Sequence, residues 1–130
     1  MLDTDTCIYL IKRRSEALLS RLVATDPGEV CISVVTLAEL RFGVEKSEFR
    51  ERNAAALDAF LLPLIVAPFD PPAAEAYGFV RTALEGNGTP IGPLDTMIAS
   101  HALSLHVDLV TNNLREFSRV KALRLTNWTT

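Results

Sequence analysis

Short β-branched runs alternate with helical segments along this chain, and no other feature restricts its fold as strongly. The runs EVCISVV (29–35), LIVAPF (64–69) and DLVT (108–111) have the composition of buried strands, and LRLTNW (123–128) predicts a final short strand. Residues 1–3 are long enough only for a stub of strand. Strands that alternate with helices predict a parallel α/β sandwich, in which the working site lies outside the carboxyl ends of the strands.

Apolar residues at helical spacing, together with start and stop signals, define the helices. Ser33 or Thr36 is available as the N-cap of the helix over 36–47, and the sequence GNG (86–88) ends a long helix that begins at Pro71. The segment 112–120 is predicted as a loop or a short helix. Further helices are expected over 4–14, 15–24, 49–62 and 94–106, and the length predicts a single domain over 1–130.

Carboxylates stand where the predicted strands end. Asp3 follows the first strand, Glu39 lies one turn into the helix after the second, and Asp95 begins the helix after the loop TPIGP (89–93). Parallel strands end at one edge of a sheet, so we expect these acids to point toward the same place. Clustered carboxylates repel one another unless a cation neutralises them, and oxygen ligands suit Mg²⁺ or Mn²⁺. Such an ion activates water for phosphodiester cleavage.

Each acid taken alone has another explanation. Asp3 or Asp5 is placed to cap the first helix, Asp95 to cap its own helix, and Glu39 to lie on a solvated helix face. On the residues alone these alternatives stay open for each acid, although all four together are harder to explain in this way.

The charge distribution excludes few functions. The net charge of −3 is compatible with a nucleic acid or a metal as partner. Between residues 53 and 114 the only basic residue is Arg81, whereas the cluster Lys12-Arg13-Arg14 and the last sixteen residues are basic. A chain of this kind can hold a cation at its acidic centre beside a polyanion, and solvated helix faces explain the same pattern.

Cysteine and histidine usage argues against zinc and disulfide chemistry. Cys7 and Cys31 lie in apolar segments and are expected as reduced core residues, and His101 and His106 are five positions apart, which puts them on different helix faces. No apolar run has the length of a membrane span, and the first residues do not resemble a signal peptide. We therefore expect a cytoplasmic protein with no membrane partner.

Four motifs in order resemble the VapC-type toxins, which are PIN-domain ribonucleases of bacterial toxin–antitoxin pairs. They are MLDTDTCIYLIK (1–12), CISVVTLAELRFGVEKS (31–47), GTPIGPLDTMIASHALS (88–104) and LVTNNLREFSRVKALRLTNW (109–128), which together cover nearly the whole chain. The resemblance implies a PIN-like three-layer sandwich with a central, mostly parallel sheet flanked by helices. It also implies a metal-dependent endoribonuclease toxin that uses Mg²⁺, with Mn²⁺ able to substitute.

The resemblance assigns the site residue by residue. Asp3 in the Leu-Asp-Thr motif, Glu39 in Ala-Glu-Leu and Asp95 in Pro-x-Asp-x-x-Ile-Ala take the positions of the catalytic, metal-binding acids. Asp5 stands where the family often has Asn, and Asn113 stands where many PIN domains have a fourth acid, a role that Glu116 is close enough in sequence to take. Thr111 and Asn113 are expected to orient the ligands, and Arg115 and Arg119 to contact RNA phosphates.

The same resemblance implies the partners. A VapB-type antitoxin is expected to thread a C-terminal segment across the pocket, and the toxin is expected as a homodimer within that complex. A subset of these toxins with Thr-Asn-Asn followed by Arg-Glu-Phe resembles enzymes that cleave initiator tRNA in the anticodon loop, as TNNLREF (111–117) does here.

Two alternatives to the enzyme stay open. Asn113 in the place of the fourth acid favours a PIN-like module that binds RNA or antitoxin without cutting. Asp3-Thr-Asp5 has the Asp-x-Asp spacing of haloacid-dehalogenase-type phosphatases, but only two residues precede it and no Lys lies between residues 53 and 114.

Overall fold

A computed structural model describes residues 1–129 as a mostly helical α/β structure. Its strands are β1 (Cys31–Ser33), β2 (Ile65–Ala67), β3 (Leu109–Val110) and β4 (Leu125–Thr126). Its helices are α1 (Thr4–Ile11), α2 (Glu16–Ala24), α3 (Val34–Glu45), α4 (Arg50–Leu61), α5 (Pro71–Gly86), α6 (Pro93–Leu105) and α7 (Leu114–Phe117), with a short 3₁₀ turn η1 (Pro27–Glu29). The predicted order of strands and helices is confirmed.

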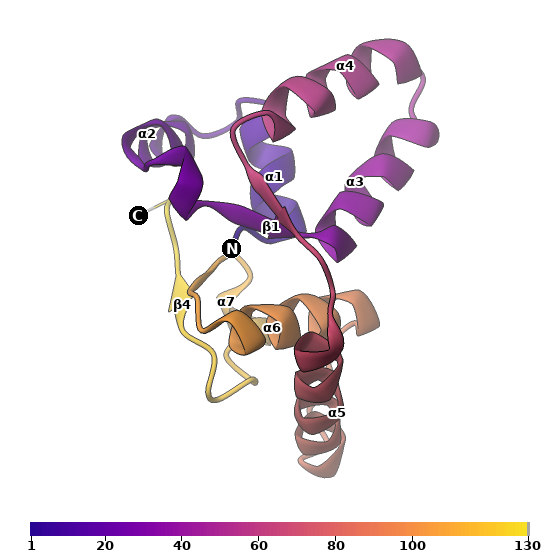
Figure 1. Cartoon of the computed structure of the whole chain (residues 1–130), viewed down its shortest axis with the longest axis vertical. Coiled ribbons are helices and arrows are strands. Elements are labelled where there is room, and N and C mark those ends of the chain that lie inside the picture. The colour runs from indigo at the N-terminus through magenta and orange to yellow at the C-terminus, as the bar shows by residue number, and fades with distance from the viewer. Residues whose placement is uncertain (130) are drawn as a thin grey trace.

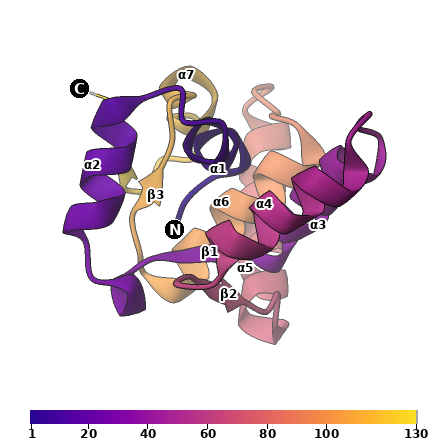
Figure 2. The same ribbon diagram turned by 90° about the horizontal axis from the view of Figure 1, so that it is seen from above.

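Leu2 joins two pairs of parallel strands. β1 pairs with β2, and β3 pairs with β4, while Leu2 forms parallel bridges to Ile32 of β1 and Val110 of β3. The Leu2 N–H donates to the Cys31 carbonyl at 2.9 Å, and the Val110 N–H donates to the Met1 carbonyl at 2.8 Å. The strand order is therefore β2-β1-Leu2-β3-β4, all parallel, and Figure 2 shows the N-terminal residues between β1 and β3.

The two faces of this sheet pack against different groups of helices. Neighbouring strand residues alternate between them: Met1 and Leu109 belong to the core cluster with α5 and α6, whereas Leu2, Ile32 and Val110 belong to the cluster with α1 to α4. In Figure 1 the helices α1 to α4 lie in the upper half and α5 and α6 in the lower half. These layers confirm the expected sandwich with a central parallel sheet.

The strands are shorter than the β-branched runs predicted. The run over 29–35 ends as a strand at Ser33, because the Ser33 Oγ accepts a hydrogen bond from the Val35 N–H at 3.0 Å and caps α3. Val34 and Val35 are therefore helical. The expected helix over 4–14 ends at Ile11, and the expected strand over 123–128 keeps only Leu125–Thr126.

No helix among residues 1–129 combines the length and the apolar character that crossing a membrane requires.

A buried histidine fastens α6 to the start of α3. The Nδ1 atom of His101 lies 2.7 Å from the Ser33 Oγ, and both side chains are fully buried. Phe69 meets the imidazole edge-on, with the ring centroids 5.3 Å apart. Burial lowers the pKa of His101, so the folded protein keeps the ring neutral. Ser33 thus both caps the helix that carries Glu39 and links it to the helix that carries Asp95.

Ser33→Ala should lower the free energy of unfolding by about 2 kcal/mol, since it removes a helix cap and leaves a buried imidazole nitrogen without its partner. Ser15→Ala is the matched control, because Ser15 caps α2 by accepting from the Leu18 N–H but has no such second partner. Urea denaturation measures both variants. Equal losses for the two would contradict the role given to His101.

Candidate active site

Asp3 is a buried carboxylate at the centre of the sheet edge. It follows Leu2 directly and is 3% exposed. One oxygen, Oδ1, accepts from the Thr6 N–H at 2.8 Å and caps α1, while Oδ2 accepts from the Thr111 hydroxyl at 2.5 Å. Burial raises the pKa of Asp3, and these hydrogen bonds oppose the rise. Asp3 is therefore a helix cap, as one alternative held, and it also faces the other acids.

Glu39 is held from α1. It lies one turn into α3, and its Oε1 accepts a hydrogen bond of 2.6 Å from the hydroxyl of Thr4. Thr4 Oγ1 also lies 3.3 Å from Thr36 Oγ1. Thr4 is not among the site residues predicted from the sequence. A signal for it was available, because Thr4 is the first residue of a helix that starts directly after Asp3.

The electrostatic surroundings of Asp95 show most clearly that the acids face one space. It lies in the first turn of α6, where Gly92 takes the N-cap position, so the expectation that Asp95 caps its own helix is wrong. Burial raises the pKa of Asp95 to about 6, and the other carboxylates add to the rise. In decreasing order of effect these carboxylates are Glu39, Asp3, Glu116 and Asp5.

Asn113 and Glu116 act together at the position where the fourth acid was sought. The Asn113 side-chain amide donates to the Glu116 Oε2 at 3.1 Å, and the Asn113 N–H donates to the Thr111 Oγ1 at 2.9 Å. Thr111 in turn donates to Asp3. A chain of hydrogen bonds therefore runs from Glu116 through Asn113 and Thr111 to Asp3. Glu116 lies three residues after Asn113 in the sequence and adds negative charge near Asp95.

The two arginines expected to contact RNA lie in different surroundings. Arg119 Nη1 donates to the Pro90 carbonyl at 2.9 Å, so it holds the loop that leads to Asp95. Arg115 is an exposed residue of α7. Neither forms an ion pair with a carboxylate among residues 1–129. Their contacts with phosphate stay a prediction.

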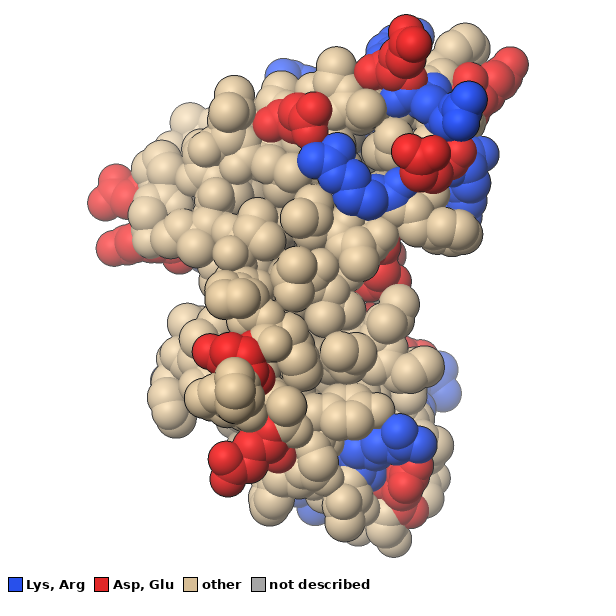
Figure 3. Space-filling view, turned by 45° about the vertical axis from the view of Figure 1, so that its right-hand side comes forward, with Lys and Arg blue, Asp and Glu red and all other residues tan. Residues whose placement is uncertain are grey.

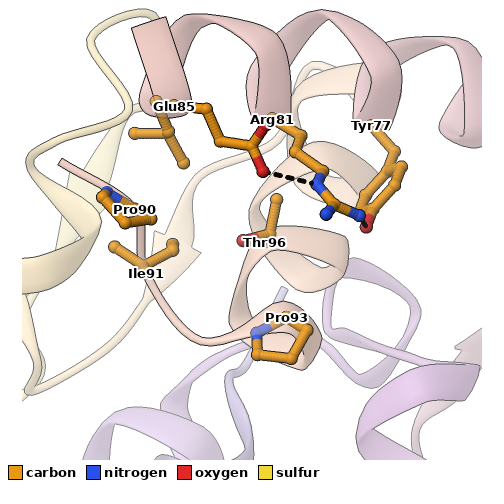
Figure 4. Close-up of a pocket in the computed structure, with 8 residues that line it drawn as sticks. Tyr77, Arg81, Glu85, Pro90, Ile91, Pro93 and Thr96 are labelled. Carbon is orange, nitrogen blue, oxygen red and sulfur yellow. Dashed lines mark hydrogen bonds and ion pairs between the residues drawn. The ribbon is translucent and has the colours of Figure 1, made fainter. Parts of the chain in front are cut away.

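A small pocket of about 210 Å³ lies between α5 and the loop that precedes α6 (Figure 4). Arg81, the only basic residue of the central segment, crosses one wall of this pocket. Its Nε donates to Glu85 at 3.1 Å and its Nη1 donates to the Tyr77 hydroxyl at 2.9 Å. Its charge is therefore engaged by neighbouring side chains of α5. On the other wall, Pro90 and Pro93 restrict the loop backbone.

The donor set fits a hydrated ion better than a closed cage. Within residues 1–129, no three His, Cys, Asp or Glu side chains are arranged to hold a metal ion by themselves. Mg²⁺ keeps several of its waters and needs only one or two carboxylates directly, so a looser ring of oxygens suits it. The donors here are carboxylate oxygens held by hydroxyl groups, and carboxylate oxygens are hard ligands that Mg²⁺ and Mn²⁺ prefer.

Asp95→Asn should stabilise the fold at neutral pH in the presence of EDTA. The pKa of Asp95 is about 6 in the folded chain against an ordinary 3.8, so stability falls as the pH rises through this window. A neutral side chain avoids that loss, and after solvent screening the gain is about 1–2 kcal/mol at pH 7.5 and near zero at pH 4.

Urea denaturation at the two pH values tests this expectation. Asp108→Asn is the control, because Asp108 forms an exposed ion pair with Arg124 at 2.7 Å and its removal should bring no gain. Identical curves for Asp95→Asn and the unchanged protein at pH 7.5 would show that the pKa of Asp95 is not raised in the folded chain.

Comparison with known proteins gives close relatives over nearly the full length. The family described as PIN domain matches residues 1–123. "Ribonuclease VapC2" of Haemophilus influenzae is 47% identical, covering 98% of this chain and 96% of the relative. "tRNA(fMet)-specific endonuclease VapC" of Salmonella typhimurium is 45% identical over the same shares.

Solved structures agree with this result. The crystal structure of DNA-bound VapBC from Salmonella typhimurium superimposes with a TM-score of 0.94 at 45% identity, covering 98% of this chain and 96% of that one. VapBC2 from Rickettsia felis, bound to a DNA fragment from the promoter, gives 0.93 at 40% identity, with shares of 98% and 97%. Of the functions that the sequence left open, the ribonuclease is confirmed, and the chain belongs to the VapC ribonucleases of the PIN-domain family.

Proposed function

We propose that this ribonuclease is the toxin of a toxin–antitoxin pair and that it cuts RNA at the acid cluster with Mg²⁺, for which Mn²⁺ can substitute. Asp3, Glu39 and Asp95 are the proposed metal-binding and catalytic residues. The observation that carries this proposal is the group of carboxylates around Asp95, which together with burial raises its pKa to about 6. A site that concentrates negative charge in this way favours a divalent cation.

The hydroxyl groups prepare the acids for that role. Thr111 and Thr4 hold the carboxylates of Asp3 and Glu39 in fixed orientations at 2.5 and 2.6 Å, so less reorganisation is needed when a ligand binds. Asp95 has to be ionised to serve as a ligand, and the cation lowers its pKa by offsetting the repulsion. Asp5 and Glu116 add charge at the rim, and Asn113 orients Glu116.

The reaction is hydrolysis of a phosphodiester. When bound, a divalent ion would supply Lewis-acid activation of water and stabilisation of the leaving oxygen. A water oxygen forms a new bond to phosphorus, the bond from phosphorus to the 3′ oxygen breaks, and the 3′ oxygen takes up a proton. The products are a 5′-phosphate and a 3′-hydroxyl. Asp3, Glu39 and Asp95 would hold the ion beside the scissile phosphate, and the exposed Arg115 would contact a neighbouring phosphate.

The proposed substrate is initiator tRNA, cut in its anticodon loop. Two relatives, at 45% and 44% identity, are named tRNA(fMet)-specific endonucleases. The residues 111–117 read TNNLREF, and Thr111, Asn113 and Glu116 of this stretch form the hydrogen-bonded chain to Asp3. A single-stranded loop leaves its backbone accessible to a site at a sheet edge.

The proposed partner is a VapB-type antitoxin, with the toxin as a homodimer in the complex. Solved relatives are VapBC assemblies, and the toxin here offers an acid cluster that a basic side chain of such a partner can neutralise. Residues 1–130 are proposed to form one PIN domain. The proposed location is the cytoplasm, because tRNA is found there.

Purified protein should cut total tRNA into discrete fragments with Mg²⁺ or Mn²⁺ and not with EDTA. Asp95→Asn should abolish the fragments while the protein stays folded, because the change removes a ligand but no helix cap. Sequencing the fragment ends identifies the target. Fragments that persist in EDTA, or in folded Asp95→Asn, would refute the proposed site.

Thr111→Val should reduce the cleavage rate by about 10–100-fold, since it removes the hydroxyl that orients Asp3 and keeps the side-chain shape. Thr126→Val on the neighbouring strand is the matched control. Its hydroxyl donates to the Asp108 carboxylate at 3.2 Å on the surface, away from the acid cluster. Equal rates for the two variants would show that the Thr111 hydroxyl does not position Asp3 for the reaction.

A further inference from the structure

A groove of about 1310 Å³ runs from the acid cluster between α1, α3 and α4. Thr4, Asp5 and Glu39 line one end of it. Lys12, Lys46 and Arg52 line the other, and the wall between them is largely apolar. The groove therefore has a negative end at the sheet edge and a positive end away from it. Nothing in the hydrolysis described above uses the positive end.

Two helices repeat the same arrangement of side chains along this groove. On α1 an acid, an apolar residue and a lysine follow at positions i, i+3 and i+7, as Asp5, Ile8 and Lys12. On α3 the same spacing gives Glu39, Phe42 and Lys46. Residues at this spacing share one helix face. Both helices start at the carboxyl edge of the parallel sheet, so their lysines lie at the same end of the groove.

The cations at this end have no carboxylate partners. Among residues 1–129, Lys12, Lys46 and Arg52 form no ion pair, whereas the nearby Arg41 pairs with Asp58 at 2.8 Å. Figure 3 shows basic side chains, with acidic ones between them, on the upper part of the molecule where α3 and α4 join. Unpaired cations that line a groove are available to an anionic ligand.

Aromatic rings lie beneath two of these cations. The Lys46 Nζ lies 5.0 Å from the centroid of the Phe42 ring, and the Arg52 guanidinium lies 5.4 Å from that of Phe49. The two rings are 64% and 56% exposed. Exposed aromatic rings beside cations are the elements with which proteins bind single-stranded nucleic acid, because bases stack on the rings while phosphates meet the cations.

We propose that the positive end of the groove binds a phosphate of the RNA strand that leaves the acid cluster. Lys12 and Lys46 contact this phosphate from the two sides, and Phe42 offers a surface for a base. Lys46 lies seven residues from Glu39, which at 1.5 Å per residue is about 10 Å along α3, the span of about three stacked nucleotides. The proposal rests on the proposed function, since it places the scissile phosphate at the acids.

Lys12 and Lys46 are also the C-cap residues of α1 and α3, where a cation interacts favourably with the helix dipole. That role predicts an effect on stability, and thermal unfolding measures it separately. Only a role in RNA binding predicts a change that depends on the length of the RNA.

The test compares Lys12→Ala/Lys46→Ala with Arg14→Ala/Lys121→Ala, which removes the same charge outside the groove. For tRNA the groove variant should lose about tenfold in kcat/KM, the equivalent of one charge-assisted hydrogen bond. The slope of log kcat/KM against log salt concentration should become shallower by about 0.7 for each phosphate that the variant no longer binds. A dinucleotide, which reaches the acids but not the lysines, should be cut equally by both variants.

A binding measurement in EDTA keeps this inference separate from the proposed function. Labelled tRNA that is not cut should bind the groove variant more weakly than the control variant, even if the unchanged protein cuts no tRNA. Equal tRNA binding and cleavage by the two variants would overturn the inference. It would also be overturned if the groove variant kept full tRNA binding and cleavage but lost affinity for the co-expressed antitoxin, because the cations would then serve a protein partner.

Discussion

The backbone of Leu2 holds the two halves of this structure together. The pairs β1-β2 and β3-β4 have no direct contact in the sheet, and parallel bridges from a single residue connect them. This arrangement places the chain start in the middle of a parallel sheet whose strands end at one edge. The next residue, Asp3, is therefore buried at the centre of that edge, and the helices that follow the neighbouring strands bring Glu39 and the 111–116 segment beside it.

The cost of this placement is electrostatic. Carboxylates that face one space repel each other, and burial together with this repulsion raises the pKa of Asp95 to about 6. Neutral donors hold the cluster in place: Thr111 and Thr4 each donate a hydroxyl hydrogen to an acid, and no arginine or lysine pairs with Asp3, Glu39 or Asp95 among residues 1–129. A cation from within the chain would neutralise the site and leave no need for an external one.

Local signals were sufficient for the order and type of the elements, because β-branched runs, caps and proline starts act over a few residues. These signals were insufficient for the boundaries of the strands and helices. Val34 and Val35 favour a strand by residue type, yet Ser33 caps α3 and both valines are helical. The three main acids could be proposed because each lies in a short motif near the start of a helix, and the fold brings them to one space.

Contacts between distant residues could not be identified from the sequence. Thr4 and Glu39 are 35 residues apart, and Thr111 and Asp3 are 108 apart, so nothing local marks these hydrogen bonds. The hydrogen bond from the Arg119 guanidinium to the Pro90 carbonyl, 29 residues away in the sequence, is another contact that no local pattern marks. The order β2-β1-Leu2-β3-β4 likewise depends on a strand too short to have a pattern of its own.

Because Asp3 has two roles, substitutions at Asp3 and at Asp95 would inactivate such a protein in different ways. Asp3 is at once a ligand candidate and the cap of α1. Asp95 caps no helix, and burial and the neighbouring carboxylates raise its pKa. If the proposed site is right, a single substitution at Asp95 removes activity and leaves the helix caps intact, while a substitution at Asp3 removes activity and a cap. Lineages that retain a silenced copy for its binding surfaces would then carry changes at Asp95 before changes at Asp3, because Asp3 also holds the start of α1.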